Sequence, residues 1–187
     1  MKKVLVLRTS VNANSITDTL TNEFLKIYTA KNPADQIIEL DLNSENLIPL
    51  TKNNIGEYFS SLKADKYIEL LKSVDKVIVT APMYNFNVSA TLKIFFDMIA
   101  QAQKTFTYKA DGAHGLLTHI SAQIISSQGA PIGWYDWADT TVWTSKMCEF
   151  LGMNVAGIIK FAGSKVAGFN FEEVNWSKEV EKDALAF

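Results

Sequence analysis

The sequence predicts an α/β protein built on a doubly wound, five-stranded parallel sheet with helices on both faces. Five short apolar segments of strand length alternate with segments whose apolar residues recur at helical spacing, which is typical of βαβ units. Two of the strand segments, VLVL at residues 4–7 and KVIVTA at residues 76–81, are apolar on both faces. Parallel strands that are covered on both sides read in this way. The rhythm fits the strand order 2-1-3-4-5.

The predicted strands and helices alternate along the whole chain. Strands are predicted at residues 4–7, 36–42, 76–81, 120–126 and 155–161. Helical faces are formed by Ile16, Leu20, Phe24, Ile27 and Tyr28, and later by Leu92, Phe95, Phe96 and Ile99 in a helix that begins near Ser89. Further helices are expected within residues 56–73, over residues 140–151 before Gly152, and on the surface from Phe171. Residues 43–55 and 104–119 are the longest irregular pieces.

Composition limits the classes of function. The chain has 187 residues, which suits one domain over residues 1–187, and 48% of them are hydrophobic. A net charge of −2 argues against nucleic-acid binding and against a strongly acidic docking protein. The single cysteine, Cys148, excludes an internal disulfide and is read as a core thiol. The apolar run at the start is too short for a signal peptide, and no stretch reaches the length of a membrane span. We therefore expect a cytoplasmic protein without a membrane partner.

Polar side chains crowd the segment after the first strand. They are Thr9, Ser10, Asn12, Asn14, Ser15 and Thr17. The following helix would offer free backbone N–H groups and the positive end of its dipole to a phosphate, and hydroxyls could complete the cradle. The alternative is that Ser15 or Asn14 only caps the helix. The surplus of hydroxyls favours a phosphate site, although the loop has no glycine and matches neither known glycine-rich phosphate motif.

Two more loops are expected at the same edge of the sheet, because the carboxyl ends of parallel strands meet there. After the third strand, Pro82 is followed by Met83, Tyr84, Asn85 and Phe86. These residues suit a planar heteroaromatic ring with polar edges, and the alternative is a hydrophobic cap on the core. After the fourth strand comes SSQGAPIGW, residues 126–134, with hydrogen-bonding side chains and a glycine that permits close backbone approach.

These motifs resemble a known family. APMYNFN at residues 81–87, SATLKIFFDMI at residues 89–99 and TFTYKADGAHGLL at residues 105–117 are similar to the FMN-dependent NADH-azoreductase family of flavodoxin-like quinone reductases, and the resemblance runs nearly end to end. It implies one FMN per chain. It places the phosphate at Ser10, Ser15, Ile16 and Thr17, the flavin ring at Pro82, Met83, Tyr84, Asn85 and Phe86, and its pyrimidine end near Ser127, Gln128, Gly129 and Ala130. In this last turn Gln128 replaces a frequent basic residue and Ala130 replaces a glycine.

The resemblance also implies an activity. NADH, and then a quinone or azo compound, would occupy the flavin in turn, in a ping-pong reaction in which flavin N5 carries the hydride. No catalytic side chain and no metal are expected. A homodimer is expected as well, because the helix from Ser89 is apolar beyond one narrow face.

Two other classes of function and several alternative residue roles compete with the oxidoreductase hypothesis. A flavodoxin-type electron carrier is disfavoured by the small net charge and by the phosphate loop without glycine. An esterase is disfavoured by the lack of a G-x-S-x-G motif. His114 is read as an exposed loop residue rather than a proton donor. Trp134, Tyr135 and Trp137 either wall a substrate pocket or pack against a second subunit.

Overall fold

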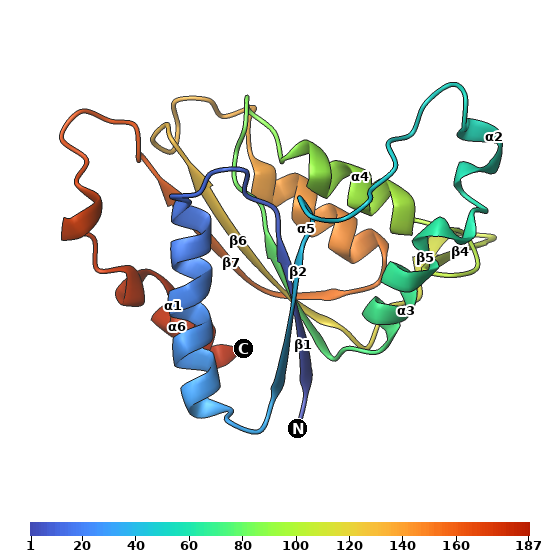
Figure 1. Cartoon of the computed structure of the whole chain (residues 1–187), viewed down its shortest axis with the longest axis horizontal. Coiled ribbons are helices and arrows are strands. Elements are labelled where there is room, and N and C mark those ends of the chain that lie inside the picture. Colours follow the sequence, from blue (N-terminus) through green and yellow to red (C-terminus); the bar gives the residue numbers. More distant parts are fainter.

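A five-stranded parallel sheet lies at the centre of the computed structural model, which describes residues 1–187 (Figure 1). The strand order is β2-β1-β3-β6-β7. The strands are β1 (Lys3–Arg8), β2 (Gln36–Asp41), β3 (Lys76–Thr80), β6 (Ser121–Gln128) and β7 (Asn154–Ala162). Because β6 and β7 are the fourth and fifth strands of this sheet, the predicted order 2-1-3-4-5 is confirmed.

Helices cover both faces of the sheet, as predicted. On one face lie α1 (Ile16–Lys31) and α6 (Trp176–Ala186), which pack against each other. On the other face lie α3 (Asp65–Lys72), α4 (Ala90–Ile99) and α5 (Thr140–Phe150) (Figure 1). The two helical layers therefore enclose two separate apolar cores.

Strand β1 shows why the sequence reads as apolar on both faces. Val4 and Val6 belong to the core beneath α1 and α6, whereas Leu5 and Leu7 belong to the core beneath α3, α4 and α5. All four side chains are at most 1% exposed. Successive side chains of a strand point to opposite faces, and each such burial stabilises the fold by about 1.5–3 kcal/mol.

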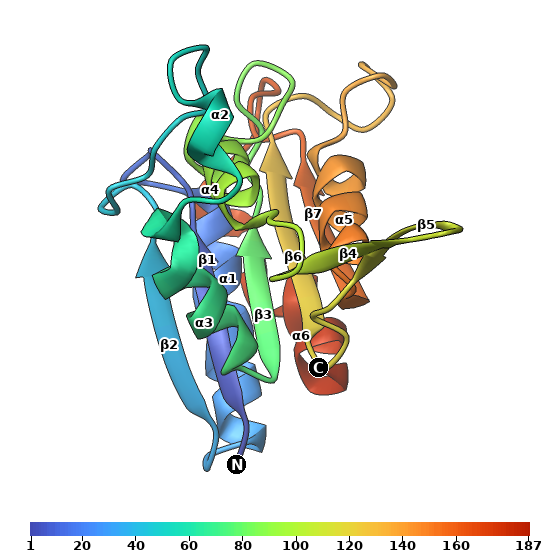
Figure 2. The same ribbon diagram turned by 90° about the vertical axis from the view of Figure 1, so that its right-hand side faces the viewer.

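Residues 104–119 were expected to be irregular, and here the structure differs. They contain an antiparallel hairpin of β4 (Phe106–Lys109) and β5 (Gly112–Gly115), which projects from the body of the molecule (Figure 2). Gly112 has a φ of +134° at the turn, a conformation that favours glycine. Strand β5 reads GAHG, which has no strand-like apolar pattern, so the pairing with β4 was not visible in the sequence.

Two helix predictions are made more precise by the structure. The helix expected within residues 56–73 is α3, and it is preceded by the short helix α2 (Ile55–Tyr58) and by a 3₁₀ turn at Leu62–Ala64. Ser61 caps this turn by accepting a hydrogen bond from the Lys63 N–H. The expected surface helix from Phe171 is a 3₁₀ turn at Phe171–Glu173 followed by α6. Val180 and Ala184 of α6 are fully buried, so this helix completes a core. None of the helices combines the length and apolar character needed to cross a membrane.

Candidate functional site

A cavity of about 380 Å³ lies at the carboxyl ends of β1, β3 and β6. It is lined by residues from four segments, three of which are the predicted loops after these strands. The lining residues are Ser10, Asn12, Asn14, Ser15 and Ile16 after β1; Pro82, Met83 and Tyr84 after β3; Ser127, Gln128 and Gly129 around the end of β6; and Ser164, Lys165, Phe169 and Phe171 after β7.

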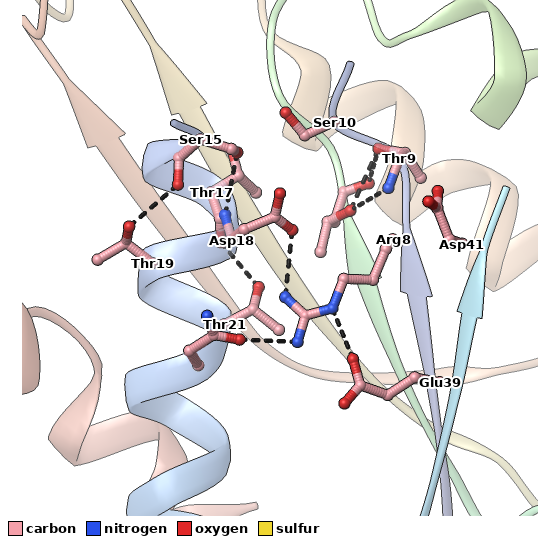
Figure 3. A network of polar contacts seen from close by, with 12 residues as sticks. Arg8, Thr9, Ser10, Ser15, Thr17, Asp18, Thr19, Thr21, Glu39 and Asp41 are labelled. Carbon is pink, nitrogen blue, oxygen red and sulfur yellow. Dashed lines mark hydrogen bonds and ion pairs between the residues drawn. The ribbon is translucent and has the colours of Figure 1, made fainter. Parts of the chain in front are cut away.

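The N-terminus of α1 presents free hydrogen-bond donors. Ser15 is its N-cap, and the Ser15 Oγ accepts a hydrogen bond from the Asp18 N–H at 3.1 Å (Figure 3). The backbone N–H groups of Ser15, Ile16 and Thr17 donate to no protein atom. These three donors lie at the positive end of a 16-residue helix. Capping and anion binding are therefore compatible here, rather than alternatives.

Hydroxyl groups tie the loops of the cavity together. Thr17 is fully buried, and its Oγ1 lies 2.6 Å from the Ser127 Oγ. The Ser10 Oγ lies 3.0 Å from the Tyr84 hydroxyl, which also accepts a hydrogen bond from the Val11 N–H at 3.0 Å. The Thr17 side chain thus joins two loops instead of lining the cavity, and only its backbone N–H is left for a ligand.

The loop after β3 turns tightly at its tip. Tyr84 and Asn87 exchange two backbone hydrogen bonds of 2.8 and 3.1 Å around Asn85 and Phe86. Both central residues are left-handed, with φ values of 47° and 69°. This conformation costs non-glycine residues about 1–2 kcal/mol each. Strain of this kind gathers at ligand sites, because the surroundings must hold it in place.

The turn after β6 offers an unpaired acceptor. The Gln128 Nε2 donates to the Ala130 carbonyl at 2.9 Å, whereas the Gln128 Oε1 is buried without a partner. A buried acceptor without a donor is unfavourable, and the side chain would have to turn its Oε1 toward the cavity before the N–H of a ligand could satisfy it. A side chain at Gly129 would crowd Lys165, because an added Cβ would lie 2.7 Å from the Lys165 Cγ.

Sequence reasoning missed the fourth wall, which follows β7. Its residues in the cavity are Ser164, Lys165, Phe169 and Phe171. The Gly163 N–H donates to the Ala130 carbonyl at 3.1 Å, and the Lys165 N–H donates to the Gly129 carbonyl at 2.9 Å. Lys165 is the only charged residue among those that line the cavity. The signal available in the sequence was the position of this segment, since it follows the last strand of the same parallel sheet.

Nine of the thirteen predicted site residues line the cavity, and four do not. Thr17 lies behind it, as described above, and Ala130 contributes backbone contacts to Gln128 and Gly163. Asn85 lines a second cavity of about 410 Å³ on the other side of the Tyr84–Asn87 turn, which also includes Trp143. The Phe86 ring is 43% exposed and packs 4.9 Å from Tyr135 and 4.8 Å from Trp137, between ring centroids.

The usual acid–base and nucleophilic groups lie elsewhere. Cys148 is fully buried in the core, and burial raises the pKa of its thiol to about 12. His114 lies on the hairpin, where its Nε2 is 2.7 Å from the Asp111 Oδ1, and His119 is exposed. No three His, Cys, Asp or Glu side chains are grouped so that they could hold a metal ion. The cavity can bind and orient a ligand, but its own side chains offer no proton relay.

The donor set fits a phosphorylated planar heterocycle. Free N–H groups at a helix N-terminus suit the phosphate. Met83 and Tyr84 offer polarisable and aromatic surface to a flat ring. The Gln128 side chain lines the same cavity, and its unpaired Oε1 would supply an acceptor for a ring N–H. These features stand at three strand ends of one sheet edge, where ligands of doubly wound folds bind.

Comparison with known proteins places the chain in a family. A family model described as a flavodoxin-like fold matches residues 2–181. The "FMN-dependent NADH:quinone oxidoreductase" of Mycoplasmopsis pulmonis is 42% identical, with 100% of each chain covered. The protein of the same name from Metamycoplasma arthritidis is 43% identical, again over 100% of each chain.

Solved structures agree on the fold. An azoreductase from Bacillus anthracis superposes with a TM-score of 0.86 at 23% identity, covering 99% of this chain and 98% of the other. An FMN-dependent NADH-azoreductase from Bacillus anthracis, solved in complex with FMN, gives a TM-score of 0.83 at 23% identity over 100% of both chains. The chain therefore belongs to the flavodoxin-like proteins and, among them, to the family of FMN-dependent NADH:quinone oxidoreductases.

Proposed function

We propose that this protein is an FMN-dependent NADH:quinone oxidoreductase that also reduces azo compounds. The observation that carries the proposal is the cavity at the sheet edge. Free N–H donors, the surface of Met83 and Tyr84, and the unpaired Gln128 Oε1 meet in it. The names of the full-length relatives supply the donor, the cofactor and the acceptor class.

The residues of the cavity would divide the work of holding one FMN per chain. The N–H groups of Ser15, Ile16 and Thr17 would bind the phosphate, and the Gln128 Oε1 would accept from the N–H of the ring imide. Lys165, the only charged lining residue, would add positive potential near a cofactor that is itself anionic. When bound, FMN supplies the two-electron redox chemistry, so the protein needs no covalent nucleophile.

An aromatic cluster at the tip of the loop after β3 gives the planar substrates a surface. It consists of Phe86, Tyr135 and Trp137, whose ring centroids lie 4.8–6.2 Å apart. Trp137 is 72% exposed, so its ring is free to stack on a quinone, an azo compound or a nicotinamide. We propose that donor and acceptor use this surface in turn, each leaving before the other binds.

We propose that the enzyme is a homodimer. The apolar residues of α4 that suggested it are mostly buried in the chain's own core, so the support now comes from the hairpin. Tyr108 on β4 is 69% exposed on this projecting arm (Figure 2). Sedimentation should give twice the mass of one chain, and Tyr108→Asp should shift it toward the monomer. A cytoplasmic location is also proposed, because NADH, the electron donor in the names of the relatives, is found inside cells.

Anaerobic spectroscopy tests the function. The purified protein should show the absorption bands of bound FMN, NADH should bleach them, and a quinone should restore them. Steady-state double-reciprocal plots for NADH at several quinone concentrations should be parallel, because the two substrates share one surface. Flavin that NADH does not reduce would point to an electron carrier. Intersecting plots would show that donor and acceptor bind together, contrary to the shared surface.

A further inference from the structure

The only arginine of the chain joins three elements next to the proposed phosphate site. The Arg8 Nη1 lies 3.1 Å from the Asp18 Oδ1, and its Nη2 donates to the Asn22 Oδ1 at 2.8 Å, both on α1. Its Nε donates to the Glu39 Oε2 on β2 at 2.7 Å (Figure 3). The Arg8 side chain is 18% exposed. All three nitrogens of the guanidinium thus have a partner, and these contacts fix the position of the group.

The position of Arg8 affects the phosphate site through its partner Asp18. Asp18 is the acidic residue of the first turn of α1, and its own N–H is held by the Ser15 Oγ. A carboxylate here stabilises the helix, because it faces the positive end of the dipole. The same carboxylate would repel a second anion that binds at the free N–H groups of Ser15, Ile16 and Thr17.

The β2 side of Arg8 adds negative charge. Glu39 and Asp41 of β2 lie on the other side of Arg8 (Figure 3). Asp41 is occupied by the N–H and side chain of Asn43 rather than by a cation. Arg8 therefore lies among three carboxylates at the base of the β1–α1 loop and forms ion pairs with two of them, Asp18 and Glu39. The other cation of the site, Lys165, lines the cavity from the segment after β7.

We infer that Arg8 is a positioning residue for the cofactor phosphate: by neutralising Asp18 and holding it against β1, it makes the N-terminus of α1 able to accept a dianion. This inference rests on the proposed binding of FMN. It concerns the phosphate alone, so Arg8 should matter for FMN and not for riboflavin, which carries the same ring without the phosphate.

The test compares both flavins on flavin-free, full-length protein, by quenching of flavin fluorescence at low ionic strength. Arg8→Met should weaken FMN binding roughly tenfold, because it exposes the cradle to an unpaired carboxylate, and should leave riboflavin binding unchanged. Adding Asp18→Asn to Arg8→Met should restore FMN binding. The loss should also shrink at high salt, which screens the repulsion.

The possible results distinguish a failure of the inference about Arg8 from a failure of the proposed function. Equal losses for FMN and riboflavin, or no rescue by Asp18→Asn, would show that Arg8 only supports the fold and would overturn the inference. Wild-type protein that binds no FMN would overturn the proposed function as well. Should Arg8→Met fail to fold, Arg8→Lys with and without Asp18→Asn gives the same comparison. A lysine keeps the charge but cannot reach three acceptors, so the FMN loss should be smaller and still be rescued.

Discussion

Two hydroxyl side chains near the start of α1 have different roles although they look alike in the sequence. Ser15 caps α1 and lines the cavity, whereas Thr17 is buried and bonded to Ser127. The free N–H groups of α1 belong to the backbone and survive substitution of either side chain. The two hydroxyls are thus separable by mutation.

Ser15→Ala should weaken FMN binding more than Thr17→Val does. Ser15→Ala removes a hydroxyl that lines the cavity together with the helix cap, whose loss costs about 1 kcal/mol of stability. Thr17→Val leaves the Ser127 hydroxyl unpaired, so it should lower the free energy of unfolding by about 1–2 kcal/mol and change affinity little. Thermal unfolding and FMN titration measure the two effects. A larger affinity loss for Thr17→Val would contradict the assignment.

Cys148 gives a test of burial by pH. The buried thiol has a pKa of about 12, raised mainly by desolvation and to a smaller extent by the charge of Glu149. An unfolded thiol has a pKa of about 8.5. The raised value means that this group contributes stability below about pH 8.5, and that the contribution is lost as the pH rises toward 12. At pH 9 iodoacetamide should label guanidinium-unfolded protein readily and native protein very slowly. Rapid labelling of native protein would contradict the core placement.

The β4–β5 hairpin is held to the body of the protein by a contact between two glycines. A Cβ added to Gly115 would lie 2.0 Å from the Gly152 N and 2.1 Å from the Leu151 carbonyl carbon. The Leu117 N–H donates to the Leu151 carbonyl at 2.9 Å, which fixes the same approach. The hairpin therefore cannot shift without breaking its junction with the end of α5.

Gly115→Ala should destabilise the protein by roughly 2–4 kcal/mol, because backbone cannot move aside as a flexible side chain can. Gly56→Ala is the matched control, since nothing lies within 4 Å of a Cβ there. It should be neutral or slightly stabilising, because alanine favours the helix. Denaturant unfolding of both variants measures the difference. Similar stabilities for the two would show that the hairpin does not dock as described.

The strands could be predicted because each apolar run lies in one contiguous segment of sequence, and their order because strands and helices alternate as in βαβ units. The β4–β5 hairpin could not, because GAHG has no apolar alternation and gains its structure from the docking of Gly115. The same holds for the fourth wall of the cavity. Lys165 is placed by its backbone bond to the Gly129 carbonyl, a contact between residues far apart in the sequence. Local patterns contain no information about such contacts.

Across the whole molecule, the sheet edge brings together loops separated by more than 100 residues. The Thr17–Ser127 contact joins the first and third loops, and the Met83 N–H donates to the Ser127 carbonyl at 2.9 Å. Two cores, one on each face of the sheet, hold the strands that present these loops. The cavity is formed between loops rather than within one of them. Its shape should therefore be kept only while the sheet holds these loops in place.

A crystal structure of the protein with FMN would show where the cofactor binds. We expect one FMN per chain in the cavity at the ends of β1, β3 and β6. Its phosphate should lie within hydrogen-bond distance of the N–H groups of Ser15, Ile16 and Thr17, its ring against Met83 and Tyr84, and the Gln128 Oε1 should accept from the ring imide. FMN bound elsewhere, or a phosphate held away from the N-terminus of α1, would contradict this expectation.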